Sequence, residues 1–479
     1  MTTGYDRLTA LDESFLHLER LETPMHIAAL SVFEGASFFD GAGHFRLAEV
    51  RELVASRLHL IPRFRKRLMN VPFGAGRPVW VDDERFDIAY HVRLTALPRP
   101  GSRAQLLTLT ERVQTQLLDR KRPLWELWFV EGLEDGHVAL IQKTHHALVD
   151  GISGVDVATV LLDFTPAPTT LDPPGWEPAP EPDPADLLFE SVTERLGDPA
   201  SFFGALRRLL EAPRAALERA THIARTIATL GAGGVVAPRT SLNESVGRHR
   251  RFTTVQVSLD DVKTVRGALG GTINDVVLTG VGGGLRSLLD ARGELTPGLT
   301  LKMFCPVSVR DDSEHLRLGN RLSAMFVPLA VAEPNPVERL RMVQATTTDL
   351  KEREQPVGAA FLVGLTEYAV PTLLGLAARL VHSQPFFNLV VTNVPGPQVP
   401  LYCMGARMLE AYPIVPLAQN LTVGIAILSY CGRLHLGLLA DRDRTPDLEV
   451  LAQGVEDAFT ELTKIARERD RGGDAEERL

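Results

Sequence analysis

Two adjacent histidines and one nearby carboxylate are the residues of this chain whose types and spacing most readily do chemistry. His145 and His146 come at the end of an apolar run, and Asp150 follows four residues after the second imidazole. Neighbouring side chains on a strand point to opposite faces, so the two rings would not converge on one metal ion. Two interpretations remain: a pair of hydrogen-bonded structural histidines, or one imidazole that faces a substrate while the other imidazole and Asp150 hold the turn.

A histidine in this position suits the removal of a proton from an alcohol. Its unperturbed pKa of about 6.5 leaves the neutral base predominant near neutral pH. Gly151, directly after the carboxylate, allows the chain to turn tightly. Asp150 could support the site by pairing with a buried arginine, because breaking such a pair would leave an uncompensated buried charge. Support and proton transfer would then be the work of different side chains.

The elements that must position these histidines are predicted from the sequence pattern. Residues 124–130 and 137–144 are aromatic and β-branched runs separated by a Glu134-Asp135-Gly136 turn, which predicts a hairpin whose second strand ends at the histidine pair. Apolar residues at helical spacing predict a helix over 47–58. A capping-box pair predicts another helix over about 102–119.

The second half of the chain shows the same mixture of strand and helix signals. Capping residues predict one helix after Ser258 and another after Thr272, where Asp275 stands three residues on. Strands are predicted at 252–257, 301–307, 386–393 and 423–428. The whole pattern is α/β (α+β), and the residues from about Arg467 onward are mostly charged or glycine and should fray.

A proline-rich segment divides the chain. At 479 residues the protein is long enough for two domains of roughly 200 residues each. Eight prolines between residues 165 and 185 exclude regular structure there, so this segment is predicted to be the domain linker. The expected division is 1–164, an N-terminal domain with the histidines; 165–185, the linker; 186–250, an amphipathic helical connection; 251–465, a C-terminal domain; and 466–479, a charged tail.

Composition and charge exclude several classes of protein. The 60 acidic residues against 51 basic ones give a net charge of -9, which argues against a nucleic-acid binder. Three widely spaced cysteines suggest neither a disulfide framework nor a zinc site. The first 16 residues lack the apolar run of a signal peptide, and no apolar stretch is long enough to span a membrane. We therefore expect a cytoplasmic protein.

The segment His145 to Gly151 matches an HHxxxDG signature, and further segments narrow the resemblance. These are Leu11-Asp12-Glu13-Ser14-Phe15-Leu16, Pro24-Met25-His26, Pro123-Leu124-Trp125, Asn274-Asp275-Val276-Val277, Pro306-Val307-Ser308-Val309-Arg310 and Asn393-Val394-Pro395-Gly396-Pro397. In order and spacing they resemble the bacterial wax ester synthase/diacylglycerol acyltransferase family, within the CoA-dependent acyltransferase and condensation-domain superfamily. The resemblance runs from about Leu8 to Leu462, apart from the proline-rich linker.

This resemblance implies a two-domain fold of the chloramphenicol-acetyltransferase type, with the active site in a tunnel between the domains. Acyl-CoA would enter as a substrate from one side and the alcohol from the other, and neither a cofactor nor a metal is implied. His146 would be the general base, with His145 and Asp150 in the same catalytic segment and Asp150 in a structural part. Asn274 and Asp275 would support the site, and Arg310 is a candidate partner of Asp150.

Several of these residues also have plainer interpretations. Asp275 could simply cap a helix N-terminus, and both parts can hold together. Ser308 and Asn393 are candidate oxyanion donors, although polar residues at turns commonly satisfy backbone groups. The glycines 282–284 lack phosphate-loop spacing and permit either close helix packing or room for an acyl chain.

Two basic segments, 63–67 and 248–251, could receive the phosphates of CoA. A run of charges is more commonly a solvated face, so the same segments could equally lack any ligand. The apolar stretch Ala359–Val381 and the basic amphipathic stretch Phe202–Leu230 could attach the protein peripherally to a lipid surface.

The predicted function is acyl transfer from acyl-CoA to diacylglycerol, giving triacylglycerol, and also to long-chain alcohols, giving wax esters. The insoluble product indicates work at a membrane or lipid-droplet surface, with no nucleic-acid partner. Two alternatives stay open: a condensation-type acyltransferase that uses another acceptor, and a lipid-binding relative without turnover. The first would be favoured by a carrier domain, which this sequence does not contain, and an intact HHxxxDG segment argues against the second.

Overall fold

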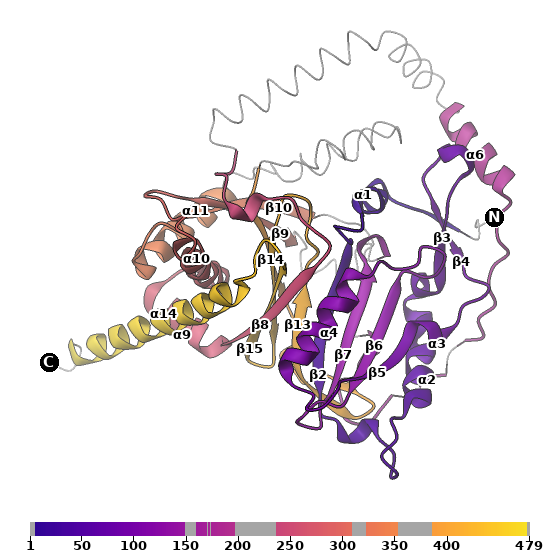
Figure 1. The fold of residues 1–479 in the computed structure, drawn as a ribbon, viewed down its shortest axis with the longest axis horizontal. Coiled ribbons are helices and arrows are strands. Elements are labelled where there is room, and N and C mark those ends of the chain that lie inside the picture. Colours follow the sequence, from indigo (N-terminus) through magenta and orange to yellow (C-terminus); the bar gives the residue numbers. More distant parts are fainter. Residues whose placement is uncertain are drawn as a thin grey trace, which may run out of the picture.

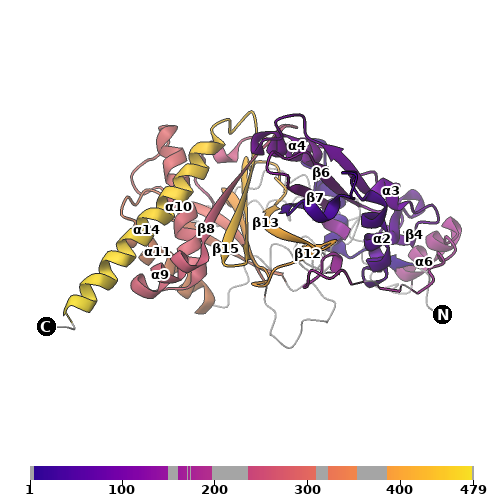
Figure 2. The ribbon, with the colours of Figure 1, turned by 90° about the horizontal axis from the view of Figure 1, so that it is seen from below.

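The computed structural model describes residues 5–148, 160–169, 171–172, 174–196, 236–308, 322–352 and 386–476. Within these ranges the chain forms two six-stranded sheets and a small three-stranded sheet, with helices packed around them (Figures 1 and 2). The mixed α/β architecture agrees with the predicted fold class. The small sheet, in the order β1–β4–β3, consists of β1 (Asp6–Arg7), β3 (Lys66–Met69) and β4 (Val79–Asp82).

The first large sheet carries the histidine pair. Its strands run in the order β12–β13–β2–β7–β6–β5 and are β12 (Tyr402–Cys403), β13 (Ala406–Ile414), β2 (His26–Phe33), β7 (Val138–His145), β6 (Trp125–Glu131) and β5 (Val92–Ala96). The predicted hairpin is confirmed as β6 and β7, and Gly136 in its turn has a φ of 70°, which glycine adopts at little cost. The hairpin places His145 at the last position of β7.

Two strands of this sheet come from the far end of the chain. β13 pairs with β2, so that Tyr412 lies opposite Leu30 and Ile414 opposite Ala28. It thereby covers an edge of β2 that would otherwise expose unpaired backbone groups. The predicted division into domains by residue number stays a prediction, but the sheets do not follow it strictly, because 402–414 complete the sheet formed by the N-terminal residues. Figure 2 shows β12 and β13 between the two halves.

The second large sheet lies wholly in the C-terminal half. Its order is β10–β9–β11–β14–β15–β8, with β8 (Arg250–Ser258), β9 (Leu301–Ser308), β10 (Leu322–Leu329), β11 (Leu389–Pro395), β14 (Val423–Tyr430) and β15 (Arg433–Asp441). β11 runs parallel to both of its neighbours, and the other pairs are antiparallel. The strands predicted at 252–257, 301–307, 386–393 and 423–428 are therefore confirmed, with ends that differ by a few residues.

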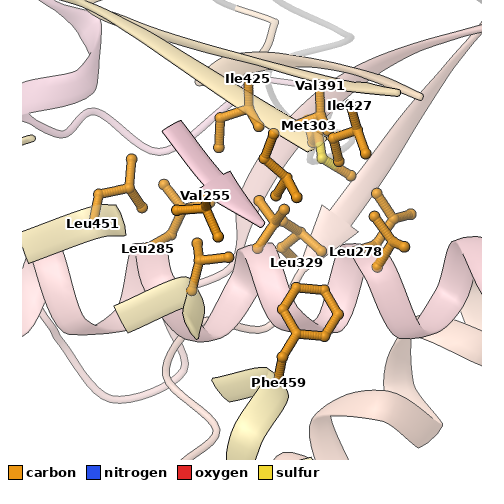
Figure 3. Packing of buried hydrophobic residues seen from close by; sticks show 14 of the residues in the cluster. Val255, Leu278, Leu285, Met303, Leu329, Val391, Ile425, Ile427, Leu451 and Phe459 are labelled. Carbon is orange, nitrogen blue, oxygen red and sulfur yellow. The ribbon is translucent and has the colours of Figure 1, made fainter. Parts of the chain in front are cut away.

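Helices cover one face of this second sheet (Figure 1). They are α9 (Leu259–Leu269), α10 (Ile273–Ala291), α11 (Pro336–Glu352) and α14 (Leu448–Glu476). Their apolar sides and those of the strands form one buried core, in which Leu278 and Leu285 of α10 meet Phe459 of α14 and Val255 of β8 (Figure 3). Burial of these side chains stabilises the half by about 1.5–3 kcal/mol per large apolar residue.

The glycines of α10 allow α14 to pack against it closely. A Cβ atom at Gly283 would lie 2.5 Å from the Cβ of Ala458, and one at Gly284 would lie 2.4 Å from the Cγ2 of Val455. Of the two interpretations of these glycines, close helix packing is thus confirmed for 283 and 284. At Gly282 a Cβ would meet nothing nearer than 3.6 Å, so this position tolerates a methyl group.

The two halves meet along β13, which packs against β14 and β15. The approach is close enough that a Cβ at Gly437 of β15 would lie 2.0 Å from the carbonyl oxygen of Pro413. Polar pairs cross the same boundary: Arg103 of α4 donates to the hydroxyl of Thr254 in β8 at 3.1 Å, and the Gln256 amide of β8 donates to the Tyr412 hydroxyl of β13. The halves therefore share one packed interface.

Further helices lie around the first sheet, namely α1 (Ala10–Leu18), α2 (Leu47–Arg57), α3 (Ile88–His91) and α4 (Arg103–Thr115). The helix α6 (Pro184–Leu196) lies beside the small sheet instead, where Leu187 packs with Val79 and Val81 of β4. The predicted helix over 47–58 is confirmed as α2. The capping box at the start of α4 is confirmed between Ser102 and Gln105, although α4 ends at Thr115, earlier than predicted.

The prediction about the proline-rich linker is confirmed, whereas the prediction about the C-terminal tail is wrong. No helix or strand forms in the described part of 165–183, as the prolines required, and α6 begins at Pro184, a first-turn position where proline is tolerated. The prediction that the chain frays from about Arg467 is wrong, because α14 continues to Glu476. The glutamate and the arginines between 467 and 471 are good helix formers and extend the helix begun by its apolar face, although Gly472 and Gly473 beyond them are poor ones.

Two predicted lipid-contacting segments, Phe202–Leu230 and Ala359–Val381, lie outside the described residues. Among the helices that the structure describes, none is long and apolar enough to cross a membrane.

Candidate active site

Backbone pairing at the end of β7 brings three motif segments together. His145 pairs with His26 of β2, and its backbone N–H donates to the carbonyl of Leu124 at 2.9 Å. The backbone N–H of His146 donates to the carbonyl of Met25 at 2.8 Å. The chain then forms a short 3-10 turn, His146–Leu148. The segments around residues 25 and 124, about 120 and 20 residues before the histidines respectively, thus fix the backbone of the pair.

The two histidines differ in exposure, as the alternation of a strand predicts. The side chain of His145 is fully buried, while His146 is partly exposed. The Nδ1 of His145 accepts a hydrogen bond from the backbone N–H of Ala147 at 3.0 Å. His145 therefore ties its ring to the turn that carries His146, which supports the interpretation of one structural and one reactive imidazole.

His146 stacks on an aromatic ring from α1. The ring centroids of His146 and Phe15 are 3.9 Å apart, with 21° between the ring planes. Burial lowers the pKa of His146 to about 4. The imidazole is consequently neutral near pH 7, which is the protonation state that a general base requires.

Sequence reasoning missed the buried carboxylate beneath the pair. Glu19 follows the last residue of α1, and its side chain is 2% exposed. Its Oε1 lies 3.3 Å from the Nε2 of His145 and 3.1 Å from the Nε2 of His26. Neither ring nitrogen is aligned for a full hydrogen bond, so these contacts are chiefly electrostatic. No local pattern marks Glu19, because its partners are distant in the sequence.

The charges around Glu19 explain how it can be buried. Burial by itself would raise its pKa, but the interactions with His145 and His26 hold the pKa of Glu19 well below its usual range. Arg120 supplies a full positive charge, since its Nη2 donates to the Oε2 of Glu19 at 2.8 Å. Burial lowers the pKa of His26 to about 4, so this imidazole is neutral as well. The buried anion is thereby compensated.

A buried lysine also lies near the pair, and it too was not predicted. Lys143, two residues before His145 on the same face of β7, donates to the backbone carbonyls of Val113 and Gln116 at the end of α4. A cation at a helix C-terminus is favourable. Burial lowers the pKa of Lys143 to about 8. The sequence could have indicated this buried lysine, because Lys143 stands at an inward-facing position of a strand that is otherwise apolar.

Asp150, Gly151 and Arg310 lie outside the described residues, so their predicted parts and the predicted pairing of Asp150 with Arg310 stay predictions. Ser308 is the last residue of β9, and its side chain is not described.

Asp275 engages both of its carboxylate oxygens. Oδ2 accepts from the backbone N–H of Thr272 and from its hydroxyl, each at 2.8 Å, and completes the predicted capping box of α10. Oδ1 accepts from the hydroxyl of Thr347 of α11, also at 2.8 Å. The side chain is 3% exposed. The capping interpretation of Asp275 is therefore confirmed, and the carboxylate also ties α10 to α11.

Asn274, beside this cap, meets one of the candidate oxyanion donors. The Nδ2 of Asn393, near the end of β11, donates to the Oδ1 of Asn274 at 3.2 Å. The structure thus joins two separate predicted motifs, while a role of either residue at the reaction centre stays a prediction.

The two basic segments are largely occupied by partners within the chain. In the first, Lys66 pairs with Asp6 at 2.7 Å, and the guanidinium of Arg65 lies over the ring of Trp176 in the linker. In the second, Arg250 is buried and donates to the carbonyl of Glu22, while Arg251 pairs with Glu449 at 2.8 Å. These contacts favour structural parts over the binding of phosphates.

Among the described residues, no cluster of three or more histidine, cysteine, aspartate or glutamate side chains is arranged to hold a metal ion.

Known proteins resemble the chain over nearly its whole length. Residues 8–277 match the wax ester synthase/diacylglycerol acyltransferase catalytic domain, and residues 318–463 match the C-terminal domain of the same family. A putative diacylglycerol O-acyltransferase of Mycobacterium bovis is 34% identical over 474 residues, which cover 97% of both chains.

Two solved structures extend the comparison. The wax ester synthase/diacylglycerol acyltransferase of Marinobacter aquaeolei superposes with a TM-score of 0.67 at 28% identity, over 96% of this chain and 99% of that one. The starter condensation domain of rhizomide synthetase superposes with a TM-score of 0.56 at 15% identity, over 98% and 96% of the two chains. The second likeness shows that the fold is common to both proteins.

Proposed function

The chain belongs to the wax ester synthase/diacylglycerol acyltransferase family and is an acyltransferase, and we propose that it transfers a long-chain acyl group from acyl-CoA to the hydroxyl of diacylglycerol, with His146 as the general base. Long-chain alcohols are proposed as second acceptors, giving wax esters.

The proposed reaction needs only a base, a positioned thioester and a positioned alcohol. His146 removes the proton of the alcohol as its oxygen attacks the thioester carbonyl. The tetrahedral oxyanion then expels the thiolate of CoA, which takes the proton from the imidazolium. General-base catalysis contributes about 10² to 10⁴ in rate, so positioning and oxyanion donors supply much of the remainder.

The observation that carries the proposal is the state of the His146 ring. It is partly exposed and stacks on Phe15 with one face. The surrounding chain removes enough solvent from the ring to lower its pKa to about 4, so the imidazole is neutral near pH 7. The other imidazole of the pair is fully buried and bonded to the turn, so it is the less suitable base. His146 is therefore the imidazole of the pair that a substrate can reach.

The test of the proposed function is an acceptor comparison. Wild-type protein is given palmitoyl-CoA with dioleoylglycerol, with hexadecanol or with neither, CoA thiol is titrated, and the lipids are extracted and separated. Acceptor-dependent thiol release with triacylglycerol formed is the expected result. Release that depends on neither acceptor, or binding of palmitoyl-CoA without release, would favour the condensation-type or the lipid-binding alternative.

The same proposal implies work at a lipid surface, because diacylglycerol and the products are insoluble in water. We propose peripheral association with membranes or lipid droplets in the cytoplasm. Flotation with liposomes, with and without anionic lipid, tests this part. Protein that remains at the bottom of the gradient in both cases would contradict it.

A further inference from the structure

Glu19 lies at the junction of the elements that hold the candidate base, and we propose that it is a positioning residue for His146. The proposal rests on the proposed function and deepens it. Glu19 would not touch the substrates. It would instead act through His145 and Met25, whose hydrogen bonds hold the His146–Leu148 turn.

The first route runs through the ring of His145. The Nδ1 of His145 accepts from the N–H of Ala147 at 3.0 Å, so in the neutral ring the proton must be on Nε2. That Nε2 faces the Oε1 of Glu19 at 3.3 Å. A carboxylate only accepts, and it therefore favours the one tautomer in which His145 can bind the turn.

The second route runs through the backbone of Met25. Its N–H donates to the Oε1 of Glu19 at 3.3 Å, and its carbonyl accepts from the N–H of His146 at 2.8 Å. Glu19 also stands one helical turn after Phe15, the residue stacked on the His146 ring, and the backbone N–H of Glu19 donates to the Phe15 carbonyl. Displacement of Glu19 would thus disturb the turn and the stacked ring together.

Arg120 makes the charge of Glu19 hard to replace by an amide. Its guanidinium, which only donates, contacts the Oε2 of Glu19 at 2.8 Å through Nη2 and at 3.2 Å through Nε. In a Glu19→Gln variant the amide oxygen would turn toward Arg120, and the NH2 group would face the two imidazoles. The partial positive charge of that NH2 group would disfavour a proton on Nε2 of His145 and favour one on Nδ1, where it would oppose the N–H of Ala147.

The experiment compares Glu19→Gln with Glu22→Gln. Glu22 is three residues away, and its side chain pairs with Arg248 at the surface, so it provides the same chemical change outside the network. For Glu19→Gln we expect kcat to fall roughly 10- to 100-fold, the scale seen when a group that orients a metal-bound histidine is lost. The KM for acyl-CoA should stay within about twofold, and Glu22→Gln should match wild type.

A double variant separates positioning from general destabilisation. In Glu19→Gln/Arg120→Met the amide is free to turn its oxygen back to the imidazoles, so part of the lost kcat should return. A purely structural role of the carboxylate predicts that the two changes add their losses. Absence of recovery in the double variant, or a Glu19→Gln variant with kcat within threefold of wild type, would overturn the proposal.

Nitrogen-15 NMR of histidine-labelled protein gives a readout that needs no turnover. In wild type the His145 signals, assigned by their loss in His145→Gln, should show a protonated Nε2 and an unprotonated Nδ1. Wild-type His145 protonated on Nδ1 would refute the proposal without any change at Glu19. If the wild-type tautomer is as expected but no acceptor supports CoA release, the proposed function fails while the positioning network stands.

Discussion

The end of β7 and the start of α10 each carry a motif with a buried carboxylate nearby, yet the two carboxylates are used differently. Both carboxylate oxygens of Asp275 accept hydrogen bonds, one from the N-terminal cap of α10 and the other from Thr347 of α11. All of these partners hold helices in place. Glu19 contacts two imidazoles, one of which is bonded to the turn that carries the partly exposed His146. A buried carboxylate therefore indicates a role in catalysis only where the residues that it contacts are bonded to a side chain that a substrate can reach.

The two regions also differ in how their motifs are assembled. α10 begins with a cap and continues with glycines that face α14, so its motif residues position a helix. The end of β7 gathers backbone bonds from residues 25 and 124 around a short turn. From this comparison we expect substitutions at β7 to change the rate, and substitutions at the start of α10 to change the stability.

Removal of the candidate base should lower the reaction rate more than any other single substitution considered. His146→Ala should lower acceptor-dependent kcat by about 10² to 10⁴, the range for general-base catalysis. Thermal unfolding should change little, since the ring is partly exposed and its stacking is with one side chain. His44→Ala, at an exposed histidine, is the matched control. An unfolding midpoint that drops with kcat would place His146 among the structural residues.

Substitutions of glycine at the contact between α10 and α14 should change the free energy of unfolding. Gly283→Ala should destabilise the protein by about 1–3 kcal/mol, because its Cβ would lie 2.5 Å from that of Ala458. Gly282→Ala should be neutral or stabilise by up to about 1 kcal/mol, because alanine favours helix and its Cβ has room. Chemical denaturation measures both. Equal losses at the two positions would contradict the packing role assigned to Gly283.

A smaller stability effect is expected at the cap. Asp275→Asn should cost about 0.5–2 kcal/mol of unfolding free energy, since an amide cannot accept from Thr272 and Thr347 with both of its terminal atoms. The change in kcat should be minor. A loss of kcat larger than tenfold at unchanged stability would remove the distinction between the two carboxylates and give Asp275 a part in the reaction.

Local patterns made much of the fold and half of the site predictable. The capping boxes at Ser102 and Thr272 and the hairpin before His145 depend on residues that are near in sequence, and all three are confirmed. Strand alternation likewise predicted the opposite exposure of the two histidines.

Contacts between distant residues were not predictable in this way. Glu19 meets a ring 126 residues away, and β12 and β13 join a sheet whose other strands precede residue 146. Nothing in the spacing around either segment specifies those partners. The acyl acceptor likewise cannot be predicted from local sequence patterns, because one methylene group in a binding tunnel changes the free energy of discrimination by only about 1–3 kcal/mol.

The pH dependence of acceptor-dependent kcat/KM tests His146 as the general base, because it reports the pKa of the base in the free enzyme. Burial lowers the pKa of His146 from its usual 6.5 to about 4, so the neutral base is present above that value and is lost as the pH falls through it. Folding must be followed alongside, since an imidazole that titrates near 6.5 when unfolded weakens the fold progressively below that pH.

We predict that kcat/KM stays level from pH 7.5 down to about 5.5 while the protein remains folded. A fall in kcat/KM with an apparent pKa between 6 and 7 in folded protein would contradict His146, with its lowered pKa, as the base.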